Sequence, residues 1–173
     1  MRGWRATTQG RHDEAEKVFA TGLALPPQLL ERADRRRMLV MMAELLETTG
    51  AARREQPRLA RALELAMELL KDLDRSKVVF EQDQRWRAAM VVGNVLYRDG
   101  RTQEAEPFFR KVLDQRPAHT GAMNNLAAIL QDTADRLPEA VAIYEAALLI
   151  PAGRRDKMLL NSYGASVSWS YCH

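Results

Sequence analysis

Asparagine is the residue type in this sequence whose chemistry best suits a binding site. The chain contains four asparagines, Asn94, Asn124, Asn125 and Asn161. Each falls in a segment whose apolar spacing predicts a helix, on the side away from the apolar stripe, although asparagine is a mediocre helix former. An amide side chain offers a donor and an acceptor together, so it can pair with the backbone of a bound peptide. The pattern favours noncovalent recognition.

Residues that could support catalysis or hold a metal are scattered along the chain. His12 and His119 fall in predicted turns, and neither has a cysteine or carboxylate at ligand spacing. The adjacent side chains of Cys172 and His173 make a poor chelate, and Asp72 falls near a predicted helix end, where a solvated charge is expected. No glycine-rich phosphate loop or serine elbow is found. The sequence predicts no enzymatic activity, no cofactor and no metal.

Two nearly identical stretches indicate the elements that must position the asparagines. Residues 100–109 read GRTQEAEPFF, and residues 10–19 read GRHDEAEKVF. Small and apolar residues and then a proline follow at equal spacings in both copies, at Ala105, Phe109, Leu113 and Pro117 and at Ala15, Phe19, Leu23 and Pro27. Spacings of four place these residues on one face of a helix, which glycine precedes and proline ends.

Another helix is predicted before the glycine of the later copy. One face of AAMVVGNVLYRDG carries Ala89, Val92, Gly93 and Leu96, and Met123, Leu126, Ala127 and Leu130 fill the same positions 34 residues later. The segment PEAVAIYEAALLIP then supplies a second helix through Ala140 and Tyr144. The chain therefore repeats a pair of helices.

This helix pair resembles the tetratricopeptide repeat, which has a small residue in its first helix, a glycine turn, alanine and an aromatic residue in its second helix, and a final proline. Residues 86–119 fit that pattern. Residues 120–152 depart from it, with Ala127 in the small position, a longer turn, and Pro151 one position early. The resemblance implies an all-α fold, a right-handed solenoid of antiparallel helix pairs.

We expect the chain to divide into five parts. They are a truncated unit at 1–29, an irregular long helix pair at 30–85, a regular repeat at 86–119, a repeat with a lengthened turn at 120–152, and an unfinished helix with a C-terminal tail at 153–173. In the irregular pair Gly50 resembles a turn glycine, and a stripe on the later helix comprises Leu59, Ala62, Leu63, Ala66, Met67, Leu70 and Leu73. Neither end looks finished, as expected of a fragment or of ends that dock on another subunit.

In the tetratricopeptide family the first helices line a concave groove that holds a partner segment. By this resemblance the candidate groove residues are Arg87, Met90, Asn94, Tyr97, Asn124, Asn125, Ala128 and Gln131. Asn94 and Asn125 match two asparagines of grooves that clamp a terminal carboxylate, but Met90 stands where that clamp has a lysine. The expected ligand is therefore peptide backbone. The alternative is that these amides are only solvated or join neighbouring helices.

Two other classes of function stay open. The arginine-rich stretches ADRRRM and GAARREQPR suggest an RNA-binding helical repeat as an alternative. Acidic residues offset these arginines, however, and the net charge is only +3. The other class is a structural subunit that docks through its ends, with Tyr163, Val167 and Trp169 as an exposed apolar patch. Protein binding in the groove is the preferred interpretation, with self-association through the ends as a further expectation.

Cysteine content and hydropathy bear on the compartment. The single cysteine, Cys172, has no partner within the chain for a disulfide. No apolar run is long enough to cross a membrane, and the first residues lack the apolar stretch of a signal peptide. We expect the cytoplasm or another reducing intracellular compartment.

Overall fold

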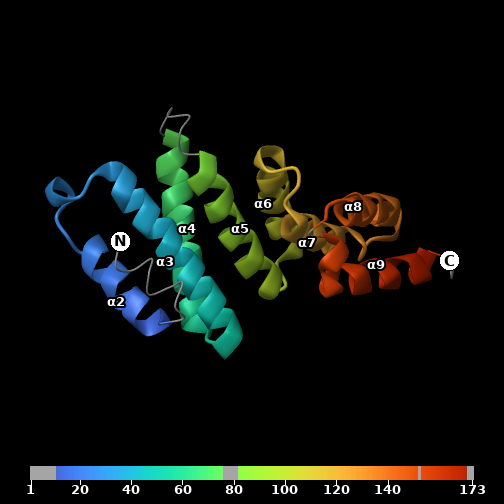
Figure 1. Ribbon diagram of the computed structural model, residues 1–173, viewed down its shortest axis with the longest axis horizontal. Helices are drawn as coiled ribbons and strands as arrows, with labels where there is room; N and C mark the ends of the chain where they lie inside the picture. Colours follow the sequence, from blue (N-terminus) through green and yellow to red (C-terminus); the bar gives the residue numbers. More distant parts are fainter. Residues whose placement is uncertain (1–10, 76–81, 152, 171–173) are drawn as a thin grey trace. The chain divides into compact units, whose positions relative to one another are not determined.

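The computed structural model describes residues 11–75, 82–151 and 153–170, which form helices joined by short turns (Figure 1). The chain divides into two compact units, Met1–Val95 and Leu96–His173. The first unit holds α2 (His12–Leu23), η1 (Pro27–Leu29), α3 (Arg32–Arg53), α4 (Gln56–Arg75) and most of α5 (Gln82–Arg98). The second holds the end of α5, α6 (Thr102–Gln115), α7 (Thr120–Leu130), η3 (Ala134–Arg136), α8 (Leu137–Leu149), η4 (Gly153–Arg155) and α9 (Lys157–Ser170). Strands are absent from the described residues.

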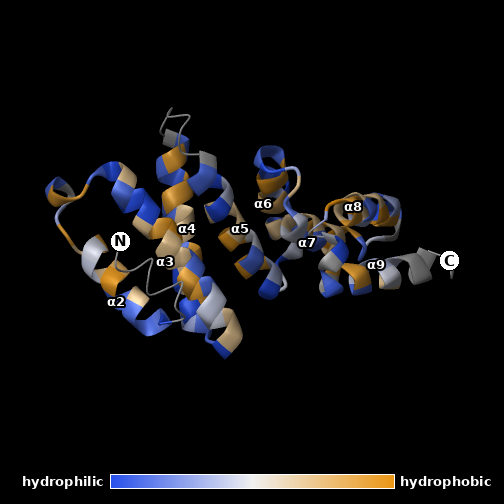
Figure 2. Cartoon of the chain, in the orientation of Figure 1, coloured by the Kyte–Doolittle hydropathy of each residue, from blue (hydrophilic) through white to orange (hydrophobic). Residues whose placement is uncertain are grey.

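The core of the first unit lies along the α3 and α4 hairpin, and α2 also packs on α3. Hydrophobic and hydrophilic residues alternate along both helices of the hairpin, as in amphipathic helices (Figure 2). The α4 side of the core comprises Leu59, Ala62, Leu65, Ala66, Leu69, Leu70 and Leu73. The predicted stripe was therefore wrong at Met67, which is 36% exposed, and at Leu63, which is half-buried. Leu65 and Leu69 are buried instead, because the stripe turns with the helix at 3.6 residues per turn.

Gly50 is not a turn residue, contrary to the sequence-based expectation. Helix α3 continues to Arg53, and Arg54 takes the left-handed conformation that ends it, with φ of 55°. Gly50 is buried within α3, and a Cβ atom there would lie 3.0 Å from Cβ of Arg58. Glycine at this position thus favours the close approach of α4.

The second unit consists of helices packed in sequence, α6 on α7, α7 on α8, and α8 on α9. Its core confirms the predicted faces, with Ala105, Phe109, Leu126, Ala127, Leu130, Ala140 and Tyr144 all buried. Gly100 has a φ of 76°, which confirms the predicted turn. His119 begins α7, where its Nδ1 atom accepts a hydrogen bond from the backbone N–H of Ala122 at 3.1 Å.

The all-α fold class predicted from the sequence is confirmed. Antiparallel helix pairs joined by short turns occur within each unit, as the repeat spacing predicts. The first ten residues of the truncated unit predicted at 1–29 lie outside the described residues.

Candidate peptide-binding site

The side of α7 away from the core carries four of the predicted groove residues, Asn124, Asn125, Ala128 and Gln131. We call this set the amide face. Its members fall three, four and seven positions apart, so they share one side of the helix and its C-cap. All four are half-buried, whereas the core side of α7 is formed by Ala122, Met123, Leu126, Ala127, Ile129 and Leu130. The amide face is uncharged and offers small or amide side chains.

The two asparagines of the amide face contact each other. Nδ2 of Asn124 donates to Oδ1 of Asn125 at 3.4 Å. Oδ1 of Asn124 is buried and has no hydrogen-bond partner among the described residues. An acceptor left in this state destabilises the fold by roughly 1–3 kcal/mol.

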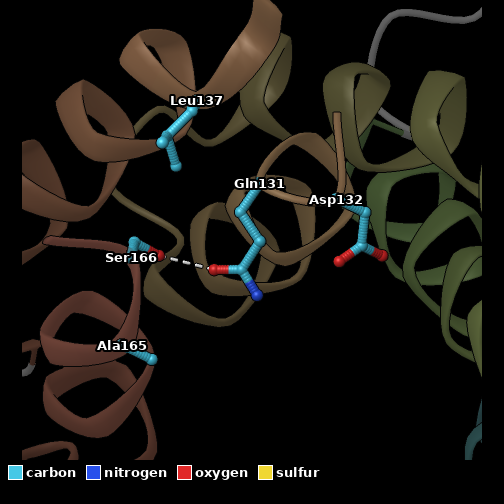
Figure 3. A pocket seen from close by; sticks show the side chains of 5 residues that line it. All are labelled: Gln131, Asp132, Leu137, Ala165 and Ser166. Atoms are coloured by element: carbon cyan, nitrogen blue, oxygen red, sulfur yellow. Dashed lines mark hydrogen bonds between the residues drawn. The ribbon is translucent and has the colours of Figure 1, made fainter. Parts of the chain in front are cut away.

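Gln131 connects the amide face to α8 and α9. Its Oε1 atom accepts hydrogen bonds from the hydroxyl of Tyr144 at 3.2 Å and from Oγ of Ser166 at 2.5 Å. These two donors fix the amide group, so its nitrogen points to the open side (Figure 3). The carboxylate of Asp132 points to the same side (Figure 3).

A pocket opens beside Gln131, and we call it the Gln131 pocket. Its volume is about 360 Å³, and its lining residues are Gln131, Asp132, Leu137, Ala165 and Ser166. They come from the end of α7, the start of α8 and the middle of α9. Of these five residues only Gln131 was predicted from the sequence. The lengthened turn after α7 was the one signal that could have indicated Asp132 and Leu137.

Two tyrosines near the pocket are kept neutral by their surroundings. Burial raises the pKa of Tyr97, and the negative charge of Asp132 raises it further. Burial also raises the pKa of Tyr144, while hydrogen bonds with Ser162 and Ser166 oppose the change. Both phenols are protonated at neutral pH, and the Tyr144 hydroxyl donates to Gln131.

The remaining predicted groove residues, Arg87, Met90 and Asn94, belong to the first unit, and all three are half-buried. Arg87 forms a two-bond ion pair with Glu44 of α3, with Nε at 2.7 Å from Oε1 and Nη2 at 2.5 Å from Oε2. This hydrogen bonding raises the pKa of Arg87 further above its usual value. Arg87 thus links α5 to α3, a contact that the sequence did not reveal.

Residues 96–158 match the family model described as Tetratricopeptide repeat. This region consists of tetratricopeptide repeats. The resemblance inferred from the helix-pair spacing is therefore confirmed, and the matched residues include Tyr97 and the whole amide face. No match to this sequence is found among curated proteins.

Solved tetratricopeptide-repeat structures share the fold. A point mutant of MamA matches with a TM-score of 0.68 and 16% identity over 98% of this chain and 84% of its own. MamA MSR-1 matches with a TM-score of 0.68 and 17% identity over 99% and 84%. A protein of Podosopora anserina designated a putative kinesin light chain, with nearly identical TPR-like repeats, matches with a TM-score of 0.69 and 17% identity over 96% and 84%. Identities this low show the fold alone.

Three of the six arginines in ADRRRM and GAARREQPR, which suggested an RNA-binding repeat, make tertiary contacts in the first unit. Arg36 is buried against Asp72, and Nη1 of Arg35 donates to the backbone oxygen of Leu23 at 3.0 Å. Arg58 pairs with Glu16 at 2.5 Å. A nucleic-acid surface needs cations that are free to meet phosphates, and these three arginines instead hold helices of the first unit together.

The apolar patch expected of end-docking is not formed at Tyr163. The Tyr163 ring packs edge-on against Tyr144 with ring centroids 6.5 Å apart, and its hydroxyl donates to Glu145 at 3.2 Å. The side chains of Val167 and Trp169 lie outside the described residues. Tyr163 therefore packs against α8 through its ring.

Within residues 11–75, 82–151 and 153–170, no group of three or more His, Cys, Asp or Glu side chains is placed to hold a metal ion. Among the same residues, no helix combines the length and apolar character needed to cross a bilayer.

Proposed function

We propose that this chain is a non-catalytic protein-interaction module whose repeats bind a segment of a partner protein. The amide face of α7 carries the proposal. It presents uncharged small and amide side chains at helical spacing, and all four of them are half-buried. Backbone N–H and C=O groups of a peptide are the complementary ligands. We place this function in the cytoplasm or another reducing compartment, because the chain has one cysteine.

The ionisable groups of the second unit support a binding role rather than a catalytic one. Glu106 accepts two hydrogen bonds from Arg136, at 2.8 and 2.7 Å, and one from Arg110 at 3.0 Å. Hydrogen bonding from Arg136 is the largest cause that lowers the pKa of Glu106 to about 2. Such a group stays ionised at neutral pH and joins helices, whereas a general base needs a pKa near the working pH.

Peptide selection tests this function directly. The immobilised full chain is used to select from a random dodecapeptide library displayed on phage, and the selected peptide is then synthesised and its affinity measured by fluorescence anisotropy. A double variant, Asn124→Ala with Asn125→Ala, should weaken binding by roughly tenfold or more, which corresponds to two lost hydrogen bonds.

The matched control is Gln103→Ala, which removes an exposed amide from α6. It should leave the affinity unchanged. Alanine favours the helix more than asparagine does, so weakened binding by the double variant cannot be assigned to a lost helix. Failure of the wild-type chain to select any peptide, or equal affinities of all three proteins, would overturn the proposal.

A further inference from the structure

Asp132 is an exposed carboxylate in the Gln131 pocket that no described cation neutralises. The basic residue nearest in the sequence is Arg136, four positions along. Arg136 is instead held by Glu106 through two hydrogen bonds, and it also lies 3.5 Å from Glu139. The carboxylate of Asp132 is therefore available to pair with a cationic group that does not belong to the described residues.

The rest of the pocket limits what that group can be. Both hydroxyls that reach Gln131 already donate to its Oε1 atom, so the available donor is the amide nitrogen of Gln131. Leu137 and Ala165 add apolar surface on the side of the pocket away from Asp132 (Figure 3). A complementary ligand has a positive charge, an aliphatic portion and a hydrogen-bond acceptor.

We propose that the Gln131 pocket binds a lysine or arginine side chain of the partner segment. The cationic head group lies beside Asp132, the methylene groups extend from there toward Leu137 and Ala165, and a backbone carbonyl of the partner segment accepts from the amide nitrogen of Gln131. Lysine and arginine combine a charged end with an apolar stem, so one side chain satisfies the first two features. The inference rests on the proposed function and names the chemistry of its partner.

Other ligand classes fit the pocket less well. An anion would be repelled by the carboxylate of Asp132. A divalent cation binds to several oxygen ligands, and Asp132 is the only carboxylate among the five lining residues. A purely apolar side chain would leave both Asp132 and the amide nitrogen of Gln131 without partners.

The experiment uses the selected dodecapeptide and a copy in which its basic residue is replaced by norleucine, which keeps the stem and removes the charge. Wild-type protein should bind the norleucine peptide roughly fivefold more weakly, as expected for a partly exposed ion pair. The variant Asp132→Asn should bind the basic peptide about fivefold more weakly than wild type and should not distinguish the two peptides.

The matched control is Asp135→Asn, which removes an exposed carboxylate from the same connection without changing the pocket lining. It should preserve the discrimination between the peptides. If wild type selects no peptide, the proposed function fails and this inference fails with it. If wild type selects peptides but binds the norleucine copy equally well, or if Asp132→Asn still discriminates, only the inference is overturned.

Discussion

The guanidinium group of Arg36 is buried against the carboxylate of Asp72 and joins α3 to α4. Arg36 is 3% exposed, and its Nε atom donates to Oδ2 of Asp72 at 2.5 Å. A further bond runs from Nη2 of Arg36 to the backbone oxygen of Asp72 at 3.3 Å, and Arg32 donates to Oδ1 at 2.5 Å. A buried arginine without its acid would be strongly unfavourable, so this pair fixes how the hairpin closes.

Acid should weaken the first unit through this pair. The hydrogen bond from Arg36, followed by that from Arg32, lowers the pKa of Asp72 from 3.8 to about 2. Because the unfolded carboxyl binds protons more readily, its stabilisation is present above about pH 4 and is lost as the pH falls toward 2. After allowance for its partial exposure, about 1–2 kcal/mol of stability should disappear over that window. Urea denaturation at several pH values measures this change.

The variant Asp72→Asn should flatten the acid dependence and lower stability at pH 7. The control is Asp34→Asn, because Asp34 lies 3.6 Å from Arg37 in an exposed pair. That variant should change the unfolding free energy by less than about 0.5 kcal/mol. Equal losses in the two variants would show that the burial of Arg36 does not strengthen its pair with Asp72.

Periodicity accounts for the parts of this fold that the sequence predicts. Alternation of apolar and polar residues every three or four positions located the helices, and Gly100 and Phe109 recurred at the spacing of earlier residues. The prediction that small residues occupy closely packed positions also holds, because Ala105 and Ala127 are completely buried. These features are local, so a single sequence contains them.

Contacts between distant residues account for what the sequence could not predict. The chain has 26 basic and 23 acidic residues, so the pairing of Arg87 with Glu44 is one of many combinations. The bond between Gln131 and Ser166 spans 35 positions and depends on how α9 packs. Asp132 likewise becomes a pocket residue only through the fold, because its spacing in the sequence matches no motif.

Two helical glycines should respond oppositely to alanine. A Cβ atom at Gly164 would meet nothing within 4 Å, so Gly164→Ala should stabilise α9 by about 0.5–1 kcal/mol through helix propensity. At Gly50 the added carbon would lie 3.0 Å from Cβ of Arg58 and 3.2 Å from the Leu59 side chain. Gly50→Ala should therefore give no gain or lower the melting temperature. A rise of equal size in both variants would contradict the close approach of α3 and α4.

The proline inside α6 should destabilise this helix, whereas α2, which carries the earlier copy of the motif, has no proline at the matching position. Pro107 occupies the sixth position of α6 and cannot donate a backbone hydrogen bond, whereas Lys17 occupies the sixth position of α2. We expect Pro107→Lys to raise the unfolding free energy by roughly 1–3 kcal/mol. The reciprocal change, Lys17→Pro, should lower it by a similar amount. Thermal unfolding followed by circular dichroism gives both values, and a neutral Pro107→Lys would mean that the helix already compensates for the missing bond.

The Gln131 pocket depends on a fixed orientation of the Gln131 amide group. Gln131→Met removes the acceptor of two hydroxyls, and one of them belongs to Tyr144, which is fully buried. The variant should lose roughly 1–3 kcal/mol of stability, because two hydrogen bonds to the Oε1 atom are removed together. Ser166→Ala should lose less, since Oγ of Ser166 also lies 2.9 Å from the backbone oxygen of Ser162 in its own helix.

A double-mutant cycle separates the bond between Gln131 and Ser166 from other effects of these substitutions. The combined variant should be more stable than the sum of the two losses predicts, by about 1 kcal/mol, because either change alone already breaks that bond. Asn161→Ala, on the exposed side of α9, is the control that should add independently to Gln131→Met. Additivity for Ser166 as well would mean that its hydroxyl serves the Ser162 carbonyl instead. Gln131 would then keep only the donor from Tyr144, and its amide nitrogen would no longer be held toward the pocket.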